Sequence, residues 1–246
     1  CQPSLEEVAD NSPHPKSFQI YVRGDDDWIK DLVRRVVKAN YASVTLTVDS
    51  AFYGNRERLN PAQLALRRVA AREWQKKITW ETVKLIQDEI GDIPLILKGI
   101  MTAEDAALAV EHGVQGIYIS NHGGRQLDHV LGNIQMLPEV VEAVDGKAQV
   151  FIDGGFTRGT DIVKALILGA KAVGIGRLQA YALGAGGAEG LVRCLELLER
   201  EINTTMGLIG VTSLDELSSA SVTEAMPVTL PHEHSAFPHL PGGKVG

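Results

Sequence analysis

Residues 116–126 read GIYISNHGGRQ, a short apolar run that passes into a polar, glycine-rich segment. The run at 116–120 has the nearly continuous apolar character of a strand that is buried on both faces of a sheet. His122 follows this strand almost directly, and the glycines at 123 and 124 let the backbone pass close to a ligand. The stretch therefore indicates a buried strand with functional residues at its carboxyl end.

Five further apolar runs of the same kind lie on either side of this stretch, at residues 18–22, 43–48, 94–97, 149–152 and 172–175. Helical patterns separate the runs, at residues 28–40, 79–90, 103–112, 133–144 and 161–168. Buried strands that alternate with helices indicate a parallel α/β sheet. Such a sheet is either open and doubly wound or closed into a (β/α)8 barrel.

The ends of the strands favour the TIM barrel. A barrel gathers all its strand ends on one catalytic face, whereas an open sheet concentrates its chemistry at one switch point. Here polar residues end or follow almost every run: Tyr21, Thr47, Asp49, Lys98, Ser120, His122, Asp153 and Arg177. Because six strands are two fewer than a closed barrel needs, we expect the first two β/α units to be missing from this chain and to lie upstream of Cys1.

Three segments complete the expected organisation. Residues 1–222 are expected to form strands 3 to 8 of the barrel with their helices. Residues 60–77, which are charged and rich in Arg and Ala, are expected to pass over the active-site face. Residues 223–246 combine several prolines with little hydrophobic periodicity, which indicates an extended C-terminal tail, either wrapped on a neighbouring subunit or disordered.

The composition excludes some classes of function. A formal net charge of -7 over 246 residues offers no basic face for a nucleic acid. No apolar run reaches the roughly 18 residues that a membrane span needs. The cysteines, Cys1 and Cys194, form no metal-binding or disulfide pattern, so we expect no metal site and a reducing, cytoplasmic compartment.

His122 and Arg125 are the residues whose chemistry the motif itself suggests. A histidine can accept a proton near neutral pH, and an arginine can hold a carboxylate through two parallel hydrogen bonds. A lone histidine is more often a structural, hydrogen-bonded residue. Its place at a strand end, beside two glycines and an arginine, reverses that preference.

The segment SNHGGRQ at 120–126 resembles the signature of the FMN-dependent α-hydroxy-acid dehydrogenase and oxidase family, which includes glycolate oxidase, lactate oxidase, mandelate dehydrogenase and flavocytochrome b2. Agreement runs from residues 4–8 to about Leu217 and includes 18–22, 47–49, 97–99, 153–155 and 176–177. The resemblance implies a TIM barrel that begins with two more strands, FMN as cofactor, and oxidation of an (S)-2-hydroxy acid to the 2-oxo acid.

The resemblance also implies roles for individual residues. His122 corresponds to the base, which takes either the α-proton or the hydroxyl proton, and Asp49 to the acid that pairs with it. Tyr21 corresponds to a tyrosine that hydrogen-bonds the reacting oxygen. Arg125 and Arg56 correspond to the arginines that bind the substrate carboxylate. Without the resemblance, Asp49 would be read as a helix N-cap and Arg56 as a solvated loop residue.

For the cofactor, Lys98 corresponds to the lysine beside N1 and O2 of the flavin, where a cation stabilises the reduced ring. Gln19, Thr47 and Ser120 correspond to residues that hydrogen-bond the ring or the ribityl chain. The FMN phosphate is expected at the ends of the last two strands, where barrels often bind phosphate. The residues expected there are Asp153, Gly154, Gly155, Gly176 and Arg177.

Two departures from the family pattern stand out. Position 157 is Thr where relatives usually have an Arg that helps to bind the phosphate, and Arg158 follows it. We therefore expect weaker retention of FMN. The segment after Glu57 is shorter than in relatives, which bears on substrate size and on access of oxygen.

Several alternatives stay open. The electron acceptor is O2 or another acceptor, and the lack of a visible haem domain or membrane insert favours an oxidase. A different FMN-dependent barrel, such as an isomerase, would share the glycine motifs but would not need His122, Arg125 and Arg56 together. A catalytically silent flavin-binding barrel is a third interpretation. Relatives are commonly tetramers or larger, so a homo-oligomer is expected.

Overall fold

Six strands pair side by side in one parallel sheet, in the order in which they occur along the chain. The computed structural model describes residues 3–52, 54, 73–127 and 129–225. The strands are β1 Ser17–Ile20, β2 Ser43–Thr47, β3 Leu95–Ile100, β4 Gly116–Ile119, β5 Gln149–Ile152 and β6 Ala172–Val173. Each of the six predicted apolar runs contains one of these strands or overlaps it.

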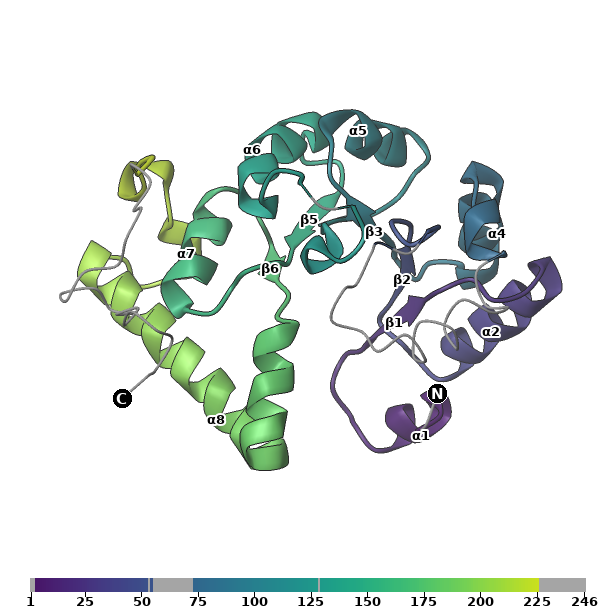
Figure 1. Ribbon diagram of the computed structural model, residues 1–246, viewed down its shortest axis with the longest axis horizontal. Coiled ribbons are helices and arrows are strands. Elements are labelled where there is room, and N and C mark those ends of the chain that lie inside the picture. Colours follow the sequence, from purple (N-terminus) through teal and green to yellow (C-terminus); the bar gives the residue numbers. More distant parts are fainter. Residues whose placement is uncertain (1–2, 53, 55–72, 128, 226–246) are drawn as a thin grey trace.

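Helices cover one side of the sheet, and each of them except α1 comes after a strand in the chain. They are α1 Leu5–Asp10, α2 Asp26–Lys38, α4 Trp80–Ile90, α5 Ala103–Glu111, α6 Asn133–Val144, α7 Gly159–Ile167 and α8 Arg177–Ile209. In Figure 1, α2 and α4 lie beside β1 and β2, α5 and α6 lie beyond β3 and β5, and α7 lies beside β6. A sheet that keeps its strand order without reversal and bears its helices on the outside is a partial TIM barrel, as the strand ends predict.

The core explains why these segments form these elements. The middle strands bury their side chains almost completely, with Leu46, Leu97 and Ile119 at 2% exposure or less. Helix α2 buries Ile29, Val33 and Val36, whose spacing places them on one helical face. The Asp25 carboxylate caps this helix by accepting a hydrogen bond from the backbone N–H of Trp28 at 3.1 Å. Burial of these apolar faces is the main stabilising contribution.

The sequence patterns do not predict the short helix α1 or the long helix α8. Helix α8 is the larger omission. Its backbone departs from helical geometry at Gly186 and Gly187, so it is broken into two parts. Only Leu198 and Met206 of its 33 residues are buried. With so few buried positions, the apolar periodicity that reveals the other helices is weak.

Three observations bear on the remaining expectations. Of the predicted excursion at 60–77, only residues 73–77 are described, and Gln75–Lys77 form the short 3-10 helix η1. Of the predicted tail at 223–246, residues 226–246 lie outside the described residues. Within the described ranges, the helices are too short or too polar to cross a membrane, and the acidic, His and Cys side chains form no group of three suited to a metal ion.

Gln75 joins the carboxyl ends of β1 and β2 although it is distant from both in sequence. Its side chain is 4% exposed. The Oε1 atom accepts a hydrogen bond from the N–H of Val22 at 2.7 Å, and Nε2 donates to the carbonyl of Thr47 at 2.6 Å. Both backbone groups would lose their partner without this amide, and buried unpaired polar groups are costly.

We predict that Gln75→Ala lowers the free energy of unfolding by about 2 to 4 kcal/mol, because two buried backbone groups become unpaired. Gln87→Ala is the matched control, since the Gln87 amide makes one exposed hydrogen bond, to the carbonyl of His112. Chemical denaturation of both variants measures the difference. Equal losses for the two variants would contradict the role of Gln75.

Candidate active site

A cavity of about 570 Å³ lies at the carboxyl ends of the strands. It is lined by residues that the sequence predicts as site residues, which come from five of the six strand ends: Gln19, Tyr21, Lys98, His122, Asp153 and Arg177. Arg125, Gly154, Gly155 and Gly176 also line it. Three predicted residues, Thr47, Asp49 and Ser120, instead hydrogen-bond to lining residues. The structure therefore brings all the described predicted residues together.

Arg56 is the exception, because it lies outside the described residues.

His122 and Asp49 form an ion-pair geometry although 73 positions separate them. The Nδ1 atom of His122 lies 3.1 Å from both carboxylate oxygens of Asp49. Both side chains are largely buried. When Nδ1 carries a hydrogen and donates it to the carboxylate, the lone pair of the neutral imidazole is on Nε2. This geometry suits a histidine that accepts a proton at Nε2, with the carboxylate stabilising the resulting cation.

The backbone at His122 has an uncommon conformation. Its φ is 57°, in the left-handed region that side-chain-bearing residues rarely adopt. Gly123 and Gly124 continue the chain with φ of 68° and 71°. The His122 N–H donates to Ser120 Oγ at 3.1 Å, which holds this turn against the end of β4. The strained turn directs the imidazole into the cavity wall, as strained residues at functional sites often do.

Tyr21 presents its phenol to the same cavity. Its ring centroid is 6.5 Å from that of His122. Gln19 Nε2 donates to the Tyr21 hydroxyl oxygen at 3.2 Å and to Thr47 Oγ1 at 2.6 Å. Burial, with a smaller contribution from Asp49, raises the pKa of Tyr21 above its ordinary value. The phenol therefore stays protonated at neutral pH and can donate a hydrogen bond to a ligand oxygen.

Lys98 places a nearly buried cation on the cavity wall, with only 8% of the residue exposed. Its Nζ donates to Ser120 Oγ at 2.8 Å and lies 3.4 Å from Asp153 Oδ2. A buried ammonium needs such partners, because removal of a charge from water is costly. Its place suits the recognition of an electron-rich or anionic group.

The segment after β5 and the start of α8 offer backbone donors to an anion. Gly154 has φ of 93°, and a Cβ there would lie 2.6 Å from Asn133 Nδ2. Asn133 Nδ2 donates to the carbonyl of Asp153 at 2.7 Å and so holds this turn. A Cβ at Gly155 or Gly176 would meet open space. Exposed N–H groups beside the amino end of a long helix form a suitable phosphate site.

Two arginines near this segment differ in their roles. The Arg177 guanidinium lines the cavity, and its Nη2 lies 3.4 Å from the carbonyl oxygen of Gly123. The Arg158 guanidinium instead lies 3.0 Å from Glu201 of α8. Thr157, the residue before Arg158, lines the cavity. Arg158 is thus directed to an ion pair and does not replace the arginine that position 157 lacks.

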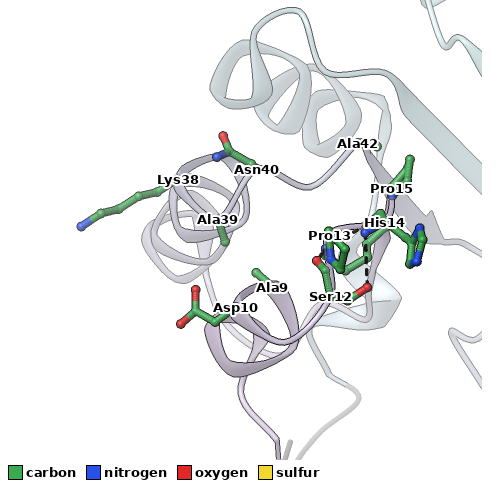
Figure 2. A pocket seen from close by; sticks show the side chains of 11 residues that line it. Ala9, Asp10, Ser12, Pro13, His14, Pro15, Lys38, Ala39, Asn40 and Ala42 are labelled. Atoms are coloured by element: carbon green, nitrogen blue, oxygen red, sulfur yellow. Dashed lines mark hydrogen bonds between the residues drawn. The ribbon is translucent and has the colours of Figure 1, made fainter.

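A second pocket, of about 460 Å³, lies at the opposite end of β1 and β2. Figure 2 shows His14, Ser12 and Asn40 among its side chains. These residues precede β1 and β2 or follow α2, so the pocket lies at the amino ends of the strands. In TIM barrels the catalytic groups lie at the carboxyl ends. The cavity around His122 is therefore the candidate active site.

Ser50 and Gln126 are site residues that the sequence does not reveal. The Ser50 hydroxyl donates to Asp49 Oδ1 at 2.8 Å, and Gln126 Nε2 donates to Ser50 Oγ at 2.8 Å. Their contact joins segments that are 76 positions apart. The only sequence signal is their position, since Ser50 follows Asp49 and Gln126 ends the motif at 120–126.

Comparisons with known proteins all point to the same protein family. The profile of the family described as FMN-dependent dehydrogenase matches residues 2–70 and 59–224. L-lactate oxidase of a Nostoc species is 39% identical, over 88% of this chain and 67% of that protein. Glycolate oxidase of Spinacia oleracea is also 39% identical, over 89% of this chain and 66% of that protein.

Solved structures give the same result. The crystal structure of mandelate oxidase with (S)-2-phenylpropionate has a TM-score of 0.74 and 41% identity, and the match covers 86% of this chain and 64% of that one. This chain therefore spans about two thirds of the length of the relatives it matches.

Proposed function

The chain belongs to the FMN-dependent dehydrogenase family, and from this premise we propose that it carries the catalytic residues of an enzyme that oxidises an (S)-2-hydroxy acid to the 2-oxo acid. The observation that carries the proposal is the His122–Asp49 pair on the same cavity as the buried Lys98. The relatives act on lactate, glycolate and mandelate by name, and all three are 2-hydroxy acids.

The cofactor of the family is FMN, and the residues of the cavity fit it. Lys98 offers a buried cation to the ring, and Gln19 and Ser120 offer hydrogen-bonding groups nearby. Gly155 and Gly176, with Arg177, offer a place for a phosphate. Bound there, FMN supplies the acceptor of the two electrons that the alcohol loses.

The protein's own residues bind and orient the substrate. Arg125 lines the cavity and would hold the substrate carboxylate through its guanidinium. Arg56 is assigned the same task by the resemblance alone. The protonated phenol of Tyr21 would donate to the oxygen that becomes the carbonyl. Fixing the substrate at both groups leaves its α-carbon in one orientation.

His122 would take up, at Nε2, either the α-proton or the hydroxyl proton of the alcohol. The Asp49 carboxylate lies 3.1 Å from Nδ1 and stabilises the imidazolium that forms. The carboxylate also prevents rotation of the ring away from the cavity. Proton transfer to a positioned base of this kind contributes roughly 100- to 10,000-fold to a rate.

An oxidase is the favoured form of this activity, with O2 as the final electron acceptor. Support comes from the names of the relatives, which are lactate, glycolate and mandelate oxidases. A dehydrogenase with another acceptor and a silent flavin-binding barrel are the alternatives. Homo-oligomer formation and the division into a barrel at 1–222 and a tail at 223–246 stay predictions.

Anaerobic reduction tests the proposal. Addition of glycolate, L-lactate or (S)-mandelate to the FMN-loaded protein should bleach its visible flavin absorbance with at least one of these acids. His122→Ala should retain bound FMN yet reduce it at least about 100-fold more slowly, because the base is lost. His14→Ala is the matched control, since His14 lies in the pocket of Figure 2, at the far ends of the strands.

Bleaching at the wild-type rate in His122→Ala would remove His122 from the role of base. A yellow wild-type protein that no 2-hydroxy acid bleaches would overturn the proposed activity and favour the silent barrel.

A second prediction concerns FMN retention. Thr157→Arg should tighten FMN binding about ten-fold, because a guanidinium on the cavity wall gains a charge-assisted hydrogen bond to the phosphate. Thr160→Arg is the control, as it adds the same charge on the exposed surface of α7. Quenching of flavin fluorescence gives both dissociation constants. An unchanged constant in Thr157→Arg would contradict the account of the phosphate site.

A further inference from the structure

A series of hydrogen bonds leads to Asp49 Oδ1, one of the two carboxylate oxygens that lie 3.1 Å from His122 Nδ1. Gly54 N–H donates to Gln126 Oε1 at 3.3 Å. Gln126 Nε2 donates to Ser50 Oγ, and the Ser50 hydroxyl donates to Asp49 Oδ1, each at 2.8 Å. Ser50 is 3% exposed, so water does not compete readily for its hydroxyl.

The direction of these hydrogen bonds follows from the first donor, the backbone N–H of Gly54. A backbone N–H can only donate, so the group of Gln126 that faces Gly54 must be the carbonyl oxygen. The amide nitrogen then faces Ser50 and donates to it. With its oxygen engaged as acceptor, the Ser50 hydroxyl directs its single hydrogen to Asp49. In this series of hydrogen bonds, each donated hydrogen therefore points towards the Asp49 carboxylate.

The Asp49 side chain also packs against the backbone of β3. Gly99 follows Lys98 in β3, with φ of 108°, and a Cβ there would lie 2.6 Å from Asp49 Cβ. The strand pairing is irregular at this point, between Lys98 and Ile100. Asp49 therefore packs directly on bare backbone, and its remaining freedom is rotation of the carboxylate, which the Ser50 hydroxyl opposes.

The same contact joins two loops of the active-site rim. A Cβ at Gly54 would overlap the carbonyl oxygens of Arg125 and Gln126, so the two segments touch through their backbones. Gln126 is the neighbour of Arg125 in the chain. The segment that carries Asp49 and the segment that carries His122 and Arg125 are therefore held in one register.

We propose that Ser50 and Gln126 are positioning residues that fix the Asp49 carboxylate so that His122 carries its hydrogen on Nδ1 and keeps Nε2 free as the base. The inference rests on the proposed function for its effect on catalysis. Its effect on the imidazole is independent of that function, because the hydrogen bonds exist without substrate.

The first test reads the tautomer of His122 by NMR in the FMN-loaded protein, with nitrogen-15 in the histidine rings. In the wild type, the signals should report a protonated Nδ1 and an unprotonated Nε2. Ser50→Ala and Gln126→Met should each give a mixture of the two tautomers, because the carboxylate becomes free to rotate. Ser50→Thr restores a hydroxyl and should restore the wild-type pattern.

Ser17→Ala is the matched control. Its hydroxyl is also hydrogen-bonded, to Thr45 Oγ1 at 2.8 Å, but at the start of β1, away from the cavity. Loss of this hydroxyl should leave the His122 signals unchanged. A wild-type tautomer pattern in both Ser50→Ala and Gln126→Met would overturn the proposal, and it would do so whether or not the protein oxidises 2-hydroxy acids.

The second test is kinetic. With a 2-hydroxy acid that reduces the flavin, Ser50→Ala should lower kcat about ten-fold, a part of what a positioned base contributes, and leave KM within about two-fold. Ser50→Thr should recover most of the loss. A rise of about ten-fold in KM with unchanged kcat would mean that Ser50 acts on substrate binding, and it would overturn the positioning role.

Discussion

Parallel pairing of the six strands in chain order is the constraint on which the whole site depends. Thr47 pairs with Lys98, and Ile119 pairs with Ile152, so the residues that follow these pairs leave the sheet at the same level. The central strands β2 to β4 keep this register because most of their side chains are buried. A slip of β3 by one residue would turn Lys98 away from the cavity, and its neighbour Leu97 or Gly99 would take its position.

Two pairs of polar side chains stand at the cavity. Lys98 lies 3.4 Å from Asp153, and His122 lies 3.1 Å from Asp49. In the proposed function, the first pair would offer its cation to FMN, and the second would offer an imidazole to a substrate proton. The four side chains are mostly buried, so loss of one partner of the Lys98–Asp153 pair would leave the other charge uncompensated, which costs about 3 to 5 kcal/mol for a buried pair. The Lys98–Asp153 pair therefore contributes to stability, and in the proposed function both pairs contribute to the chemistry.

The sequence predicts the features that leave a pattern among neighbouring residues. Apolar runs identify the six strands, and the polar residues at their ends include His122 and Lys98, which line the cavity. Helix α8 is missed because only two of its residues are buried. Ser50 and Gln126 are missed because their hydrogen bond spans 76 positions, which no local pattern records. The pairing of Arg158 with Glu201 likewise depends on the packing of α7 on α8.

The most direct test of the account is a crystal structure of the protein with FMN bound. The account predicts FMN in the cavity at the carboxyl ends of the strands, with the ring in contact with Lys98 Nζ and the phosphate at Gly155, Gly176 and Arg177. FMN bound elsewhere, or a ring out of contact with Lys98 and remote from His122, would contradict it.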